Sequence, residues 1–283
     1  QPLSAAKVLP HDHERAHLVA RIWSPAHGGP VPVLVRRGGL CDLRGFAPTV
    51  SQLLEQADLV ARLDAAPDLP SLVSLDAAIG NADPKTRDPS RPWLLAPCDL
   101  QALKASGVTF VSSMLERVIE EQAKGAPEKA RAIRAEVERQ LGGDLRRLKP
   151  GSPQALALKK TLIEAGAWSQ YLEVGIGEDA EIFTKAQPMS AVGHGMEAGL
   201  HPRSTWNNPE PEVVLVVAST GKIVGATLGN DVNLRDFEGR SALLLSKAKD
   251  NNASASVGPF IRFFDAGFTL DSVRAMDVAL DVK

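Results

Sequence analysis

Two glutamates separated by a single residue are the side chains whose spacing most directly suggests chemistry. Glu210 and Glu212 stand in Asn207–Val217, whose apolar run is typical of a β-strand. Side chains two residues apart on a strand point to the same face, so these carboxylates would converge. Converging carboxylates repel each other and need a cation, and oxygen ligands alone suit Mg2+ or Mn2+ better than Zn2+. A solvated strand start would carry the same pair, and Pro211 between them is typical of an edge strand or bulge.

A second acidic group lies in Gly229–Arg240, directly after the next strand-like segment. Its first carboxylate is Asp231, and further charged side chains follow around a turn. A polar helix cap at Asp231 would explain much of this segment without any chemistry. If a hairpin brings the two segments together, however, Asp231 completes a three-carboxylate metal site with open positions for a substrate.

The elements that must position these residues fall into three stretches. The first 97 residues indicate a small β-rich domain, with strands over Leu18–Trp23 and Val31–Arg37, a helix over Ser51–Leu63 capped by Thr49, and a loop over Ala65–Pro92. Helical patterns dominate as far as Gly166, and strands return after it, over residues 181–186, 212–219, 222–229 and 257–264. We therefore predict an α+β chain with two domains, residues 1–97 and 98–283, the second holding a helical insert (117–166) before its strands (167–283).

Composition and charge bound the class of protein. The chain has 283 residues, 44% of them hydrophobic, and a formal net charge of -2, which gives no electrostatic reason to expect nucleic acid or an anionic membrane as a partner. No apolar run approaches the length of a membrane span, and the first residues lack a signal-peptide pattern. Cys41 and Cys98 lie far apart without a zinc-type spacing, so the reducing cytoplasm is the expected location.

Five segments together resemble the fumarylacetoacetate hydrolase superfamily in order and spacing. They are FTKAQP (183–188), PEPEVVLVV (209–217), GNDVNLRD (229–236), KAKD (247–250) and VGPF (257–260), and the likeness spans roughly residues 95–265. The resemblance implies a C-terminal mixed β-roll, a catalytic Mg2+ (or Mn2+) held by Glu210, Glu212 and Asp231, and Lys249 as a catalytic residue. It also implies a small 2-keto acid as substrate, and the candidates to bind it are Lys185, Ser190 and Arg235.

One departure from the family pattern bears on the reaction. The hydrolases of this family carry a GxNYxxHxxE segment, whose His–Glu pair activates water for attack on a carbon–carbon bond. The matching stretch here is Gly107–Glu116, with Ser113 in place of the histidine. Together with the helical insert, this resembles the branch of 2-keto-3-deoxy-pentonate dehydratases of non-phosphorylative pentose catabolism. The resemblance then implies Glu116 as the catalytic acid or base and 2-oxoglutarate semialdehyde as the product.

Two other functions stay open at this point. A carbon–carbon hydrolase of 2,4-diketo acids would use the same metal site and release pyruvate, and a non-catalytic metal- or metabolite-binding protein would keep the fold without turnover. The family's β-roll normally continues beyond the end of this sequence, so we expect a C-terminal part to be missing. Family members are commonly homodimers or homotetramers, which the resemblance implies for this chain as well.

Overall fold

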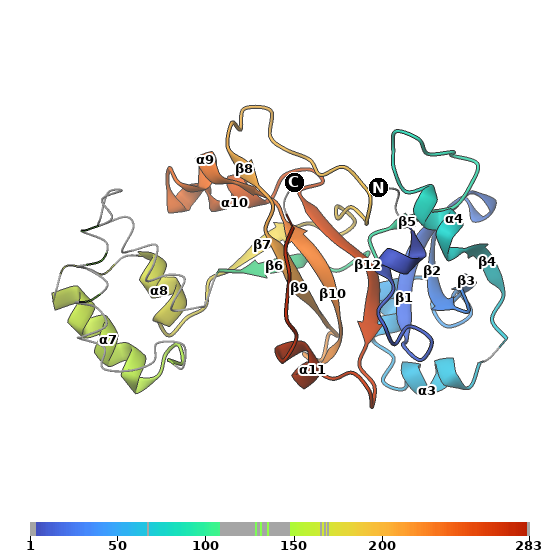
Figure 1. The fold of residues 1–283 in the computed structure, drawn as a ribbon, viewed down its shortest axis with the longest axis horizontal. Helices are drawn as coiled ribbons and strands as arrows, with labels where there is room; N and C mark the ends of the chain where they lie inside the picture. Colours follow the sequence, from blue (N-terminus) through green and yellow to red (C-terminus); the bar gives the residue numbers. More distant parts are fainter. Residues whose placement is uncertain are drawn as a thin grey trace. The chain divides into compact units, whose positions relative to one another are not determined.

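A large antiparallel sheet joins strands from both ends of the chain (Figure 1). The computed structural model describes residues 4–66, 68–107, 128, 131, 135, 148–164, 166, 168 and 170–281. The eight-stranded sheet has the order β4-β3-β2-β1-β12-β10-β9, with β5 also paired to β1. Its strands are β1 (Leu18–Ser24), β2 (Gly29–Arg36), β3 (Gly39–Asp42), β4 (Ser71–Ser74), β5 (Trp93–Leu95), β9 (Pro211–Val217), β10 (Ile223–Asp231) and β12 (Ala255–Phe263).

Short turns join some neighbouring strands of this sheet, among them β2 with β3 and β9 with β10. The β2–β3 turn uses Arg37 and Gly38, both with positive φ (50° and 73°), the combination that a tight hairpin requires. The β9–β10 hairpin closes at Gly221, with φ of 84°. The strands expected from the sequence are confirmed, with small changes at their ends. Alternating apolar residues specify the strands and turn-forming residues specify the turns, and both signals are local in sequence.

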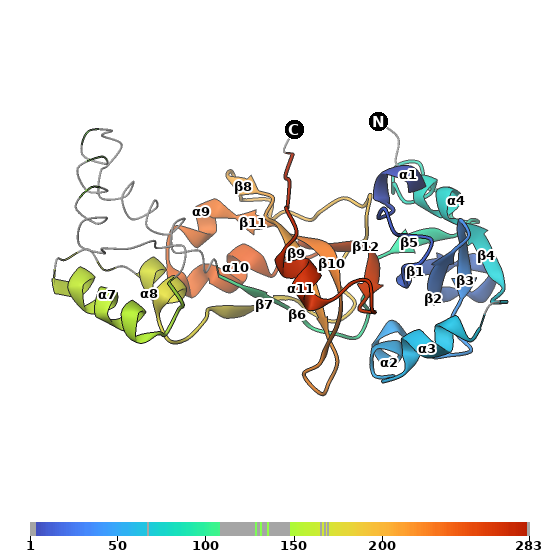
Figure 2. The same cartoon turned by 60° about the horizontal axis from the view of Figure 1, so that its bottom comes forward.

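Apolar side chains cover both faces of the N-terminal strands. Leu18 and Ile22 pack on one face with α4 (Leu75–Gly80), and Val19 and Leu34 pack on the other with α2 (Val50–Leu54) and α3 (Leu59–Asp64). Figure 2 shows these strands between the two helical layers, with α1 (Ala5–Val8) beside α4. The second cluster also includes Ile261 and Phe263 of β12, so the N-terminal and C-terminal strands share one core.

Two expectations about the first hundred residues were wrong. The single helix expected over Ser51–Leu63 is two helices, α2 and α3, although Thr49 caps the first as expected by accepting a hydrogen bond from the amide of Gln52. The expected loop over Ala65–Pro92 contains β4 and α4. The side chain of Ser74 accepts from the amide of Ala77 and begins α4, a capping signal that the Pro- and Asp-rich composition of the segment obscured.

Contact density divides the chain into two compact units, one of Gln1–Leu103 with Thr184–Lys283 and the other of Lys104–Phe183. The sequence-based boundary at residue 97 divides the chain differently.

The structure is mixed α and β with a large antiparallel sheet, as expected in outline. Its remaining elements are β6 (Leu103–Ser106) paired with β7 (Ile182–Ala186), β8 (Asn207–Asn208) paired with β11 (Asn233–Leu234), η1 (Pro25–His27), η3 (Ala242–Leu244), α7 (Pro153–Glu164), α8 (Gln170–Ile176), α9 (Arg235–Glu238), α10 (Leu245–Lys249) and α11 (Leu270–Arg274).

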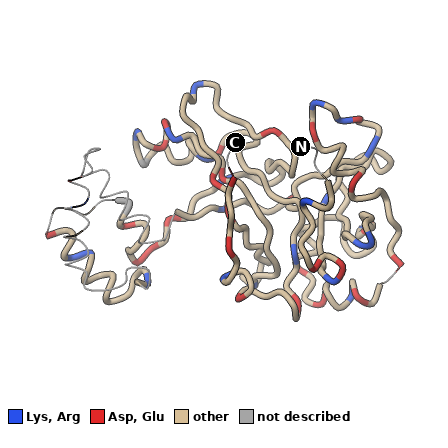
Figure 3. Tube along the Cα trace, in the orientation of Figure 1, with Lys and Arg blue, Asp and Glu red and all other residues tan. Residues whose placement is uncertain are grey.

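Charge is evenly distributed over the described part of the chain. Figure 3 shows basic and acidic residues interspersed along it, without the continuous basic track that binds nucleic acid. None of the helices that the structure describes combines the length and the apolar character needed to cross a bilayer.

Candidate metal centre

The β9–β10 hairpin brings the two acidic segments together. Glu212 lies opposite Gly229 in the pairing of these strands, and Pro211 lies opposite Asn230. The backbone amide of Asp231 donates to the carbonyl oxygen of Glu210 over 2.9 Å, so the two carboxylates leave the backbone as direct neighbours.

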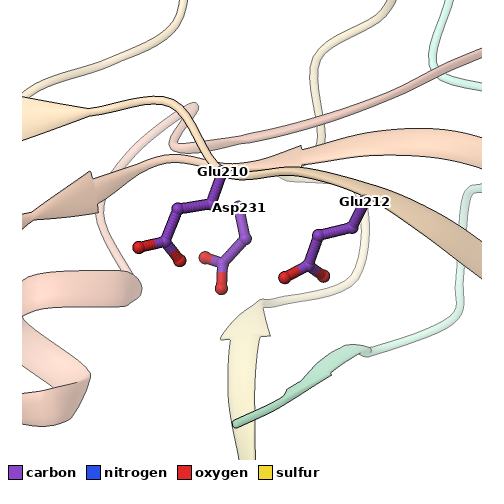
Figure 4. A group of neighbouring side chains, drawn as sticks. All are labelled: Glu210, Glu212 and Asp231. Carbon is purple, nitrogen blue, oxygen red and sulfur yellow. The ribbon is translucent and has the colours of Figure 1, made fainter. Parts of the chain in front are cut away.

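Three carboxylates converge at this end of the hairpin. Oxygen atoms of Glu210, Glu212 and Asp231 all lie within 4.8 Å of one another. Figure 4 shows the three side chains pointing to the same side of the strands. Asp231 is buried, at 5% exposure, whereas the other two are partly exposed. Such a set of three oxygen ligands, one buried and two partly exposed, fits a hard divalent cation.

Two buried lysines lie against the carboxylates. The ammonium nitrogen of Lys249 lies 2.5 Å from a carboxylate oxygen of Glu210 and 3.0 Å from one of Asp231, and that of Lys185 lies 3.0 Å from the other oxygen of Asp231. Lys185 also donates to the carbonyl oxygens of Val232 and Lys249 and lies 3.2 Å from the hydroxyl of Ser254. Protein acceptors therefore surround its three N–H groups.

The electrostatics of the cluster show that the anionic charge is only partly compensated. Burial raises the pKa of the Glu212 carboxyl, and the negative charges of Asp231 and Glu210 raise it further. Burial acts to lower the pKa of Lys249, but the charges of Asp231 and Glu210 outweigh it and the pKa is raised. Three carboxylates against two ammonium groups leave one net negative charge, which favours the arrival of a cation.

Two amide side chains donate to the carboxylate oxygen of Glu210 that Lys249 does not contact. The side-chain nitrogens of Asn233 and Asn208 lie 3.1 Å and 3.3 Å from the same carboxylate oxygen of Glu210. Asn233 also donates to Glu238, over 2.7 Å, and Arg235 lies 3.3 Å from the same oxygen of Glu238. Arg235 is thus connected to the carboxylates through two intermediates.

The remaining candidates differ in where the structure places them. The hydroxyl of Ser190 donates to the carbonyl oxygen of Gln187 over 2.7 Å, within the turn that follows β7. Glu116, and Ser113 beside it in the motif, lie outside the described residues.

The sequence analysis did not identify the asparagines around Glu210 as part of the site. The sequence feature that could have indicated them is their position close to the acidic residues. Asn208 comes two residues before Glu210, and Asn233 comes two residues after Asp231.

Comparison with known proteins finds relatives among dehydratases. No family model matches the chain. It is 42% identical over 105 residues to a 2-dehydro-3-deoxy-D-arabinonate dehydratase of Saccharolobus solfataricus, a match that covers 36% of this chain and 33% of the relative. It is 38% identical over 98 residues to a probable 2-keto-3-deoxyxylonate dehydratase of Haloferax volcanii, covering 35% and 34%. The match therefore spans about a third of each curated relative.

Solved structures extend the likeness to the fold. A 2-keto-3-deoxy-D-arabinonate dehydratase complexed with magnesium and 2,5-dioxopentanoate superposes with a TM-score of 0.53 at 19% identity, over 87% of this chain and 66% of that one. The apo form of such a dehydratase gives a TM-score of 0.54 over the same shares. The resemblance seen in the sequence is thus confirmed: about a third of the chain is similar in sequence to proteins named as 2-keto-3-deoxy-pentonate dehydratases, and its fold is similar to that of a solved one.

Proposed function

We propose that this protein is a Mg2+-dependent dehydratase that converts a 2-keto-3-deoxy-pentonate to 2-oxoglutarate semialdehyde in pentose catabolism. The observation that carries the proposal is the convergence of Glu210, Glu212 and Asp231 within 4.8 Å. The two curated relatives are named as a 2-dehydro-3-deoxy-D-arabinonate dehydratase and a probable 2-keto-3-deoxyxylonate dehydratase. The solved dehydratase with a similar fold is complexed with magnesium and 2,5-dioxopentanoate, which is 2-oxoglutarate semialdehyde.

The donor set fits Mg2+, with Mn2+ as the alternative. Carboxylate oxygens are the ligands that both ions prefer, and the described part of the cluster offers no sulfur or imidazole that would favour zinc. A bound Mg2+ would stabilise the negative charge that develops on the keto acid when a proton leaves its C3 carbon. With one net negative charge on the protein side, a divalent cation and a monoanionic keto acid together bring the site to neutrality.

The roles of the surrounding residues follow from what they contact. We assign Lys249, which bridges Glu210 and Asp231, to the head of the keto acid, where its positive charge would polarise the 2-keto group. We assign Lys185 to holding Asp231 rather than to the substrate, because protein acceptors surround its donors. Ser190 and Arg235 remain candidates for binding the more distant part of the substrate.

The proposed reaction removes one water molecule without any oxidation or reduction. Glu116 takes a proton from C3, and the C4 hydroxyl leaves with a proton as water, which places a double bond between C3 and C4. A proton then moves from C5 to C3, which gives an enol with its double bond between C4 and C5. Protonation of C4 and loss of the enol hydroxyl proton give the 2-keto aldehyde. Ser113, in place of the family's histidine, is the reason for proposing elimination rather than hydrolysis of a carbon–carbon bond.

We further infer residues 98–283 as the catalytic part of the chain, with a β-roll built from its strands, and a cytoplasmic homodimer or homotetramer. Both cysteines are unpaired, which supports a reducing compartment. Burial raises the pKa of the Cys98 thiol to about 11, so this thiol is unreactive at neutral pH.

The test is to supply synthetic 2-keto-3-deoxy-D- and L-pentonates with and without MgCl2 and to follow 2-oxoglutarate semialdehyde and pyruvate in the same reaction. We expect semialdehyde from one stereoisomer, abolished by EDTA and restored by Mg2+. Pyruvate as the main product would identify a carbon–carbon hydrolase instead. Binding of Mg2+ without turnover of either compound would favour a non-catalytic protein.

A further inference from the structure

A buried asparagine links the candidate metal ligand Glu210 to helix α9. Asn233 lies in the short strand β11, and its side chain is completely buried, at 0% exposure. One N–H of its amide donates to Glu210 over 3.1 Å and the other to Glu238 over 2.7 Å. Both donors of a single amide are therefore used on two different carboxylates.

The carboxylates also fix the orientation of this amide. Rotating the amide by half a turn would place its oxygen against the oxygens of Glu210 and Glu238, where like partial charges repel. In the observed orientation that oxygen is buried and has no hydrogen-bond partner among the described residues. Leaving one acceptor unpaired is unfavourable, but hydrogen bonds to charged groups are stronger than those between neutral groups, and this amide makes two of them. The two bonds to carboxylates thus outweigh the unpaired oxygen, and the amide is held with its donors toward Glu210.

The backbone of Glu210 is held by hydrogen bonds to Asn230 and Asp231, but its side chain is less enclosed than that of Asp231 and depends on other side chains for its orientation. Glu210 directly precedes β9, and its side chain is 26% exposed, against 4% for Asp231. Lys249 holds one of its oxygens, and Asn233 with Asn208 holds the other. An amide can hold a carboxylate without adding positive charge, so it would orient the ligand without repelling a cation.

We propose that Asn233 is a positioning residue that sets Glu210 in the orientation required to bind the divalent cation, an inference that rests on the metal site of the proposed function. Partners of this kind behind a metal ligand typically change metal affinity 10–100-fold when removed. Glu238 extends the support by one step, since it accepts from Asn233 and lies 3.3 Å from Arg235 within α9.

The experiment compares Mn2+ and Mg2+ affinity, measured by electron paramagnetic resonance and titration calorimetry, in the wild type, Asn233→Ala, Glu238→Ala and Asn81→Ala. Asn81 is a matched control. It is 5% exposed, and its amide donates to three backbone carbonyl oxygens, of Asp88, Arg91 and Pro92, rather than to a carboxylate. Thermal unfolding without metal is recorded for every variant.

We expect Asn233→Ala to weaken metal binding about 10–100-fold and Glu238→Ala to weaken it less. Asn81→Ala should lower the unfolding temperature while leaving metal affinity within about twofold. If the wild type binds and Asn233→Ala binds equally well, or if Asn81→Ala weakens binding as much, the inference is overturned and the metal site stands. If the wild type binds neither ion, the metal site and the inference both fail. If Asn233→Ala does not fold, the Glu238→Ala variant still tests the proposal, because Glu238 is partly exposed. Unchanged metal affinity in Glu238→Ala would then overturn the inference that Asn233 and Glu238 orient Glu210.

Discussion

Replacing Glu212 by glutamine should have opposite effects on the folded protein and on metal binding. The substitution keeps the shape of the side chain and removes one negative charge from the cluster. Without metal, the loss relieves repulsion from Glu210 and Asp231, the neighbours that contribute to the raised pKa of Glu212. In the proposed metal site, it replaces a charged oxygen ligand by a neutral one that binds a cation more weakly. The apo protein should therefore become more stable while its affinity for Mg2+ falls.

The magnitude follows from the spacing of the carboxylates. Two unit charges at the outer limit of this spacing, 4.8 Å, repel by about 3.5 kcal/mol at an effective dielectric constant of about 20. Lys185 and Lys249 offset part of this repulsion, and water screens a half-exposed carboxylate, so we expect a net gain of about 1 kcal/mol. For a chain of this size that corresponds to a rise of about 2 °C in Tm. Metal affinity should fall by about 100-fold or more, since loss of a direct ligand exceeds the 10–100-fold typical of residues behind the ligands.

The assay is thermal unfolding in EDTA and in excess Mg2+, with Mn2+ titration in parallel. Glu164→Gln, which makes the same charge change at an exposed position of α7, is the control and should alter neither quantity. Addition of Mg2+ should raise the Tm of the wild type, and it should raise the Tm of Glu212→Gln only slightly. A Glu212→Gln variant that is less stable than wild type in EDTA, or that binds Mn2+ with unchanged affinity, would refute the reasoning that these carboxylates repel one another and share a cation.

Three further outcomes are expected. Glu116→Gln should abolish turnover while leaving Mg2+ affinity unchanged in calorimetry, and normal turnover would remove Glu116 from its role. Lys249→Met should lower the stability of the apo protein by about 3–5 kcal/mol in urea titration, because Glu210 and Asp231 lose their shared counter-ion, and Mg2+ should restore part of it. Asp99 is 5% exposed, and although burial acts to raise its pKa, hydrogen bonds from Ser51 and from backbone amides of α2 and Leu100 lower it. Its contribution is therefore fully present above about pH 4 and is lost as pH falls through the lower folded-state pKa, so Asp99→Asn should cost about 1–3 kcal/mol at pH 7 and less under acid conditions.

The sequence by itself determined the local elements and the nature of the site. Alternating apolar residues, a glycine turn and the spacing of Glu210 and Glu212 predicted a hairpin with two carboxylates on one face, and the structure has that hairpin. These features could be predicted because strand periodicity and turn geometry depend on residues close together in the chain. The family resemblance added Lys185 and Lys249 as candidate residues near this site.

Only the tertiary structure decided which side chains meet. Pairing of β1 with β12 joins Val19 to Ile261, and no local pattern encodes a contact between residues so distant in sequence. The same holds for the partners of Lys185, because its ammonium group is enclosed by acceptors from other segments of the chain. In the sequence, Asn233 is a polar residue near a turn without any distinguishing feature. In the structure, its side chain is buried and donates to two carboxylates. Burial and long-range pairing depend on the path of the whole chain, and they determine what a polar side chain can bind.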